Sequence, residues 1–169
     1  MTAVQRRSAI YEQLTHADAP ISATALAQQF SVTRQVVVGD IALLRAEGHS
    51  ITATPRGYMI PAETGLRRTI ACHHSGADTQ RELFAMVDCG CTVLDVIVEH
   101  PVYGQLTGQL QISSRYDVQQ FLTRVQAHDA APLSMLTGGI HLHTLRCPDE
   151  AAYDRACAAL KAAGLLLDD

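Results

Sequence analysis

The first sixty residues carry the pattern that most limits the fold, because three amphipathic stretches are followed by two strand-like segments around a proline-glycine tip. Apolar residues recur at helical spacing in each stretch. Ser22 and Thr33 precede the second and third stretches, where a hydroxyl can cap a helix, and Gly48 can end the third. Three helices and a β-hairpin predict a winged helix-turn-helix. The helices are expected over 3–15, 23–30 and 34–48, and the strands over 51–54 and 58–60.

A winged helix-turn-helix lays its third helix in the major groove of DNA, so the start of that helix carries the candidate base contacts. These residues are Thr33, Arg34 and Gln35. Arg45, further along the same helix, is placed to reach a phosphate. Arg56, at the tip of the hairpin, can reach the adjacent backbone or the minor groove. The alternative is a domain of this shape that contacts another protein.

Charge and residue usage divide the chain into two parts. Residues 1–60 hold five Lys or Arg and four Asp or Glu, a balance of +1, whereas residues 61–169 hold eight and thirteen, a balance of −5. Charge alone therefore does not favour a nucleic-acid partner. The second part holds six of the eight histidines and all five cysteines, which indicates a different task. We expect two domains, 1–62 and 66–169, joined by a linker around 61–65.

Composition indicates a folded globular protein and limits where it works. Apolar residues make up 47% of the chain, too many for a disordered one. No apolar run approaches the roughly 20 residues that span a bilayer. The N-terminus lacks a signal-peptide core, so we expect a cytoplasmic protein without a membrane partner. Five cysteines, an odd number, are expected to be small buried residues rather than a disulfide framework.

Beyond the linker, strand-like and helix-like segments follow in the order strand, helix, strand, strand, helix, strand, helix, with a possible last strand. This order predicts an α+β chain whose second domain is a two-layer α/β structure with a mostly antiparallel sheet. Helices would cover one face, and the other face would be open or covered by a partner subunit. The strands are expected over 67–72, 92–98, 105–112 and 139–146, the helices over 78–88, after the cap Ser114, and over 148–161, and an edge strand over 165–167.

Two histidines lie two residues apart in the last long strand, within GGIHLHTLR. Side chains of a strand alternate faces, so His141 and His143 share a face, about 7 Å apart along the chain. If the first and last long strands are neighbours, Glu82 and either His73 or His74 can approach this pair. Three imidazoles and a carboxylate suit a divalent ion such as Ni²⁺, Zn²⁺, Fe²⁺ or Co²⁺. The same histidines could instead bind an anion or pair with backbone groups.

Long motifs in both parts resemble known families. The run FSVTRQVVVGDIALLRAEGHSITATPRGY resembles the helix-turn-helix of bacterial repressors related to the biotin repressor. Gly39 departs from that pattern, since relatives usually carry a basic residue there, and a glycine inside a helix costs about 1 kcal/mol against alanine. The runs LDVIVEHPVYGQL and LTGGIHLHT, with His74 and Glu82 upstream, resemble the three-histidine (3H) domain. The combined architecture resembles the nicotinate-responsive repressors of NAD biosynthesis and niacin uptake, the NiaR family.

The resemblance implies an HPr-like α/β fold for the second domain and a homodimer on palindromic double-stranded operator DNA. It implies nicotinic acid as the co-repressor. It also implies a divalent transition metal, with nickel expected first and zinc or iron as alternatives. The implied ligands are His74, Glu82, His141 and His143, although the residues alone leave His73 open in place of His74. His100 and Tyr103 are candidates for the nicotinate pocket, although His100 lies at a turn in VEHPVYG and could instead cap that turn.

Three other functions compete with a nicotinate-responsive repressor. A regulator could sense the metal itself, without an organic ligand. A structural zinc could hold the second domain together. A metal-dependent hydrolase or oxygenase could use an open coordination position to activate water. We expect no enzyme, because the sequence offers no independent general base beside these ligands and a DNA-reading domain is an unusual attachment for a hydrolase.

Overall fold

The computed structural model describes residues 1–61 and 64–168, and it contains two compact units, Met1–Glu63 and Thr64–Asp169. Each unit has its own hydrophobic core and is described by itself. The predicted first boundary, at residue 62, lies outside the described residues, as does the last residue of the predicted second domain. Within the described residues, no helix is both long and apolar enough to cross a membrane.

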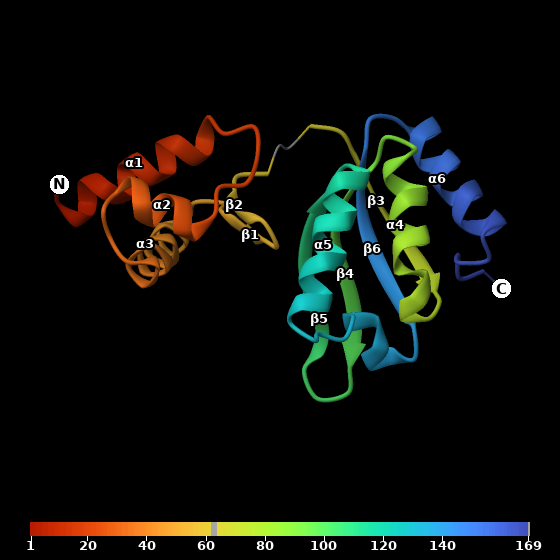
Figure 1. Ribbon diagram of the computed structural model, residues 1–169. Helices are drawn as coiled ribbons and strands as arrows, with labels where there is room; N and C mark the ends of the chain where they lie inside the picture. Colours follow the sequence, from red (N-terminus) through yellow and green to blue (C-terminus); the bar gives the residue numbers. More distant parts are fainter. Residues whose placement is uncertain (62–63, 169) are drawn as a thin grey trace. The chain divides into compact units, whose positions relative to one another are not determined.

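Unit 1 has the predicted order of three helices and a two-stranded hairpin (Figure 1). Thr33 caps the third helix, since its Oγ1 accepts the backbone N–H of Val36, and Ser22 caps the second in the same way. The chain before the second helix joins the hairpin, because Ile21 and Tyr58 exchange both backbone hydrogen bonds. The elements are α1 (Ala3–Thr15), α2 (Ala23–Gln29), α3 (Arg34–Ala46), β1 (Thr52–Thr54) and β2 (Gly57–Met59). The predicted winged helix-turn-helix is confirmed.

A charged residue of α3, Asp40, is buried inside unit 1. The Asp40 side chain on α3 is only 4% exposed and accepts two hydrogen bonds from the Arg6 guanidinium of α1, at 2.6 and 3.2 Å. Arg7 lies 3.9 Å from the same carboxylate. A buried charge is tolerated where an opposite charge and hydrogen bonds satisfy it. This pair therefore fixes α1 against the helix expected to read DNA.

Unit 2 is a four-stranded sheet with helices α4, α5 and α6 on one face (Figure 1). The strand order is β3-β6-β4-β5, and every pairing is antiparallel. The last long strand therefore lies beside the first, as the candidate site requires. The elements are β3 (Leu66–His73), η1 (Gly76–Asp78), α4 (Thr79–Val87), β4 (Thr92–His100), β5 (Gly104–Ile112), α5 (Arg115–Ala127), η2 (Leu133–Thr137), β6 (Ile140–Cys147) and α6 (Glu150–Ala162).

The predicted α+β class and the order of the elements are confirmed, with small differences at the ends. The expected edge strand at 165–167 is one bridge, between Leu166 and Cys72, flanked by two further backbone hydrogen bonds to β3. The last helix begins at Glu150, two residues later than expected, because Asp149 is its cap. β4 shifts register against β6 between Val93 and Ile97, an irregularity that the sequence did not indicate.

Side chains of β6 alternate between the two faces of the sheet, so every second residue lies on the face that the helices cover. His141, His143, Leu145 and Cys147 are buried under the helices, whereas the residues between them are more exposed. Leu145 packs in the core with apolar residues of β3 and β4. The two histidines thus continue the core face of the strand, where a polar side chain needs a partner.

Candidate metal centre

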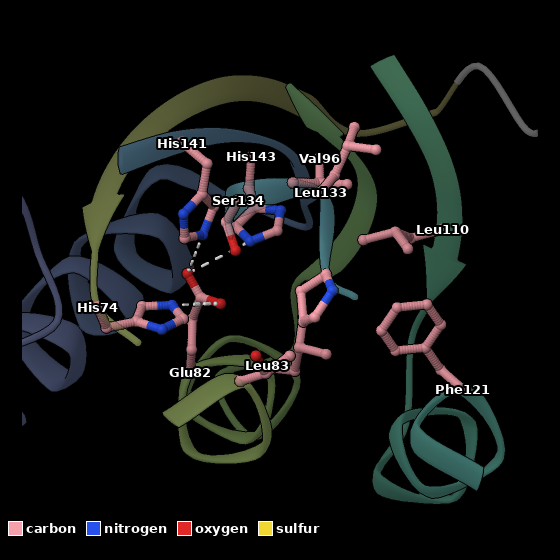
Figure 2. Close-up of a pocket in the computed structure, with 12 residues that line it drawn as sticks. His74, Glu82, Leu83, Val96, Leu110, Phe121, Leu133, Ser134, His141 and His143 are labelled. Carbon is pink, nitrogen blue, oxygen red and sulfur yellow. Dashed lines mark hydrogen bonds and ion pairs between the residues drawn. The ribbon is translucent and has the colours of Figure 1, made fainter. Parts of the chain in front are cut away.

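Three imidazoles converge on one carboxylate under the helices of unit 2 (Figure 2). The distance from His141 Nε2 to Glu82 Oε1 is 2.8 Å, and the distance from His143 Nε2 to the same oxygen is 3.3 Å. His74 Nε2 lies 2.8 Å from the other oxygen, Oε2. All four side chains are at most 4% exposed. The four residues predicted as ligands therefore meet in one buried cluster.

Strand pairing and one helix bring the four residues together. β6 pairs with β3 so that His141 lies opposite Cys72, and His74 follows two residues after Cys72, just beyond the end of β3. Glu82 lies in the first turn of α4, which favours a negative charge. His73 is exposed, because it lies on the opposite face of the strand from Cys72. The structure thus places His74, and not His73, against Glu82.

Each imidazole is fixed through its other nitrogen. His74 Nδ1 lies 2.7 Å from the Ser75 carbonyl oxygen, and His141 Nδ1 lies 2.9 Å from that of Gly139. His143 Nδ1 lies 2.6 Å from the Asp95 carbonyl oxygen, in the irregular part of β4. A carbonyl oxygen only accepts, so Nδ1 carries the hydrogen in all three rings. Nε2 of each ring is therefore the atom left to bind a proton or a metal ion.

The cluster is unsatisfied without an added cation. An ionised carboxylate only accepts hydrogen bonds, and the Nε2 of a neutral ring protonated at Nδ1 also only accepts. Among the described residues, His74 Nε2 and His143 Nε2 are buried without a hydrogen-bond partner, since their contacts with Glu82 lack hydrogen-bond geometry. Neutral rings would thus direct lone pairs at the carboxylate oxygens. Either protons or a metal ion must lie among these atoms.

Electrostatics favours positive charge here. Contact with the Glu82 carboxylate raises the pKa of His74 against the opposing effect of burial. Burial opposes charge on His143 as well, but the negative charge of Glu82 outweighs it and raises the pKa of that ring. Burial alone would raise the pKa of Glu82, yet the charge of His143 and the hydrogen bond with His141 lower it. The carboxylate thus stays ionised and attracts a cation.

The donor set fits a first-row divalent metal. Three neutral imidazole nitrogens and one carboxylate suit nickel, zinc or iron. Ligands that share one ion at about 2.1 Å are separated by roughly 3.0 to 3.4 Å. Each imidazole Nε2 lies 2.8 to 3.3 Å from a Glu82 oxygen, His141 and His143 from Oε1 and His74 from Oε2. Hydrogen bonds from Nδ1 to backbone carbonyls are also typical of metal-binding histidines.

Cys72 is a further neighbour of the cluster, in addition to the four predicted ligands. Its sulfur, a Glu82 oxygen and a His141 nitrogen all lie within 4.8 Å of one another. Burial, together with the Glu82 charge, raises the pKa of the Cys72 thiol, so the thiol keeps its proton beside the carboxylate. The signal was present in the sequence, since Cys72 and His74 are two residues apart like the histidine pair of β6.

A small pocket adjoins the imidazoles (Figure 2). Thr79 and Ser134 contribute hydroxyls to its lining, and Phe121 contributes an aromatic ring. Its volume is about 40 Å³, the space of one or two water molecules. The other apolar lining residues are Leu83, Val96, Leu110, Pro132 and Leu133.

The structure does not bring His100 and Tyr103 to this pocket. Both lie at the turn between β4 and β5, where His100 Nδ1 accepts the backbone N–H groups of Val102 and Tyr103. Tyr103 is 74% exposed. Neither residue lines the pocket beside Glu82. The motif VEHPVYG forms a hairpin turn, and His100 serves that turn.

The candidate DNA-binding residues of unit 1 lie in three places. Thr33, Arg34 and Gln35 lie together and exposed at the start of α3, although the Thr33 hydroxyl is engaged in capping. Arg45 holds the hairpin, because its Nε donates to the Ile51 carbonyl oxygen at 2.8 Å and its guanidinium lies over Tyr58. Arg56 lies between β1 and β2 at the tip of the hairpin.

Comparisons with known proteins agree with this architecture. Residues 6–59 match the model of an HTH domain, and residues 67–169 match that of the 3H domain. The chain is 40% identical over 166 residues to the probable transcription repressor NiaR of Thermotoga maritima, a match that covers 98% of this chain and 95% of the relative. It is 43% identical over 169 residues to the transcription repressor NadR of Bacillus subtilis, covering 97% and 94%.

Both relatives are named as transcription repressors, in agreement with the prediction of a regulator rather than an enzyme. Each match runs along nearly the whole of both chains, and the two domain models follow each other in the order of the two units. The chain belongs to the family of the NiaR and NadR transcription repressors, with an HTH domain followed by a 3H domain.

Proposed function

We propose that this protein represses genes of NAD biosynthesis or niacin uptake by binding operator DNA as a homodimer, with nicotinic acid as co-repressor beside a divalent metal in unit 2. The observation that carries the proposal is the convergence of three imidazole Nε2 atoms on the Glu82 carboxylate. The metal would be held by Glu82, His74, His141 and His143, with nickel as the first candidate.

The metal's chemical contribution, when bound, is a fixed positive charge that can also accept a ligand atom. The chain itself orients the site. Backbone carbonyls of Ser75, Gly139 and Asp95 hold the rings with Nε2 inward, and the rings themselves are buried. Because these donor side chains are already buried and oriented, binding a cation costs little further conformational entropy. The site thus suits a resident ion better than a transient one.

The pocket beside the imidazoles offers polar and aromatic groups that suit a flat pyridine carboxylate, but its volume is too small for one. Thr79 and Ser134 offer hydroxyl donors for the carboxylate, and Phe121 offers a ring for stacking. The volume of about 40 Å³ is far below that of ligand sites, roughly 300 to 1,000 Å³. Nicotinate therefore requires Phe121 and the η2 residues to move apart. This movement is the conformational change that we couple to DNA binding.

DNA recognition belongs to unit 1. Arg34 and Gln35 are exposed at the start of α3, where a helix-turn-helix contacts base edges. A dimer would align two such helices about one DNA turn apart. Nicotinate can shift affinity for the operator only if it binds the DNA-competent arrangement more tightly than the other.

The test combines an operator with two matched variants. The operator is selected from random DNA by the full-length protein with nickel and nicotinate. DNA affinity is then measured with and without nicotinate, before and after chelation. We expect nicotinate to raise affinity at least tenfold in the metal-loaded protein only. His143→Ala should abolish this response, whereas His73→Ala, which alters an exposed neighbour of the cluster, should keep it.

The small pocket favours one second candidate, a repressor that senses the metal itself. An ion held by the four ligands does not need the additional space that nicotinate would require. In this case chelation weakens operator binding in the same assay, and nicotinate changes nothing at any metal occupancy. Nicotinate titrated calorimetrically into loaded protein then gives no heat of binding. That pair of results would overturn the role of nicotinate and leave the metal centre in place.

A further inference from the structure

Two buried cysteines touch at the end of unit 2 that lies next to the start of α6. Cys91 immediately precedes β4, and Cys147 is the last residue of β6. Their sulfur atoms are 2.8 Å apart, and each residue is 1% exposed. The sheet explains the contact, because Thr92 lies opposite Arg146 in an antiparallel pair. The next residues outward on the two strands, Cys91 and Cys147, therefore face each other.

The geometry is close to that of a disulfide. A disulfide places its sulfurs about 2.05 Å apart, so these two need to approach by only about 0.8 Å. Facing residues of antiparallel strands have Cα atoms about 4.5 to 5.5 Å apart, within the range of about 4.4 to 6.8 Å that disulfides span. Both cysteines lie at strand ends, so the adjustment does not disturb the paired interior of the sheet.

We propose that Cys91 and Cys147 form a dithiol that hydrogen peroxide oxidises reversibly to an intramolecular disulfide. The two thiols give up two protons and two electrons, and a sulfur–sulfur bond forms. The oxygen–oxygen bond of the peroxide breaks, and two water molecules leave. An added dithiol reverses the step by exchange. The modification needs no metal and does not depend on the function proposed above.

The other cysteines provide an internal comparison. Cys89 and Cys157 are half-buried and thus easier for peroxide to reach than the touching pair. Burial raises the pKa of both Cys91 and Cys147, so each keeps its proton at neutral pH and reacts slowly. If exposure decided the outcome, Cys89 and Cys157 would be oxidised. If proximity decides it, the first disulfide joins the buried pair.

The experiment counts thiols in the full-length, reduced protein before and after incubation with hydrogen peroxide. We expect accessible thiols under denaturing conditions to fall from five to three, with a mass loss of two hydrogens. Peptide mapping without reductant should find residue 91 linked to residue 147, and dithiothreitol should restore all five thiols. The melting temperature should rise on oxidation, because the link constrains the unfolded chain between these residues.

Matched variants separate the pair from the remaining cysteines. Cys91→Ser and Cys147→Ser should each keep all four remaining thiols, whereas Cys157→Ser should fall from four to two. A map that links Cys89 or Cys157, a disulfide between two chains, or five surviving thiols at peroxide levels that oxidise a free cysteine control would overturn the proposal. The map of the unaltered protein gives this result even if a serine variant fails to fold.

Discussion

Each unit contains a buried carboxylate that contacts side chains from other parts of the fold, and the two carboxylates differ in the groups that face them. In unit 1, Asp40 accepts two hydrogen bonds from the Arg6 guanidinium, at 2.6 and 3.2 Å. In unit 2, Glu82 faces three imidazoles at 2.8 to 3.3 Å. A guanidinium keeps its charge at any pH that a protein meets, whereas an imidazole loses its charge near neutrality.

This difference in counter-charge distinguishes a structural ion pair from a site that binds an added cation. Unit 1 supplies its own counter-charge, so nothing needs to bind at Asp40. Unit 2 supplies ring nitrogens whose charge depends on protons, and two of these nitrogens have no hydrogen-bond partner among the described residues. Burying such atoms costs free energy unless a proton or a metal ion joins them. We infer that the Glu82 cluster is built for binding and the Asp40 pair for stability.

The most direct test of this comparison is to replace each carboxylate by the amide of the same length, which removes the charge and keeps the shape. Glu82→Gln keeps the shape but removes the charge among the imidazoles, so nickel affinity should fall at least about 100-fold. Asp40→Asn should leave nickel affinity unchanged and lower the melting temperature, since Arg6 loses its buried partner. Calorimetric titration and thermal melts measure both. Equal nickel affinities for Glu82→Gln and the parent protein would contradict the metal centre.

Two adjacent glycines test how the backbone positions the rings. Gly139 has φ +93°, and a Cβ there would collide with the carbonyl oxygen of His74. Its own carbonyl oxygen also accepts from His141 Nδ1. Gly139→Ala should therefore displace two imidazoles and lower nickel affinity about 10- to 100-fold, as loss of an outer partner does.

Gly138→Ala is the matched control for that variant. Gly138 also has positive φ, +62°, but a Cβ there meets nothing within 4 Å. Its cost is backbone strain of about 1 kcal/mol, without displacement of a ring. If both variants bind nickel equally well, the backbone at Gly139 does not position the site.

Acid should weaken metal binding at the Glu82 cluster. The pKa values of His74 and His143 are raised, so their Nε2 atoms hold protons more readily than a free imidazole does, and a metal must displace any proton bound there. Nickel affinity should rise by up to about tenfold per pH unit for each proton displaced, and level off above the raised pKa values. Calorimetry in buffers of different ionisation enthalpy measures the proton release. An affinity that does not change with pH would exclude protonated imidazoles at this site.

The same groups predict how the metal-free protein responds to pH. A raised histidine pKa stabilises the fold below about pH 6.5, the ordinary value, and this contribution is lost as pH rises through the raised value. The lowered pKa of Glu82 stabilises above about pH 4.3 and is lost as pH falls. Stability of unit 2 should therefore peak between these limits. Metal should remove the loss at high pH.

The sequence could predict which residues form the site, but not which contacts each of them makes there. Strand alternation placed His141 and His143 on one face, and the pairing of β6 with β3 brought His74 and Glu82 to them. The same alternation could have decided between His73 and His74, because Ile70 and Cys72 already mark the core face of β3. For His100 the sequence allows a pocket or a turn cap, and the structure shows the turn cap, with Nδ1 accepting the backbone N–H groups of Val102 and Tyr103.

Other features depend on geometry that no pattern encodes. The carbonyl that holds His143 comes from an irregular stretch of β4, and such register shifts leave no reliable mark in one sequence. The Arg6–Asp40 pair joins residues 34 apart on two helices, so only their packing reveals it. Local structure was therefore readable, whereas the partners of buried polar groups were not.

The smallest expected effect concerns Gly39, a glycine inside α3. A Cβ at this position meets nothing within 4 Å, and the residue is exposed in the helix. Gly39→Ala should raise the free energy of unfolding by about 1 kcal/mol, because alanine loses less backbone freedom on folding. Urea unfolding measures it, and Gly48→Ala, where φ is +95°, is the opposite control, which should destabilise.

The nickel affinity of Gly39→Ala sharpens the comparison between the units. Because each unit has its own core, a stabilised α3 should leave metal binding at Glu82 unchanged. Operator affinity is the informative readout, since Gly39 lies one turn beyond Gln35 on the helix expected to enter the major groove. If the more stable variant binds its operator less well, the lack of a side chain at Gly39 lets the helix lie closer to DNA. Equal or tighter binding means that the glycine only costs stability.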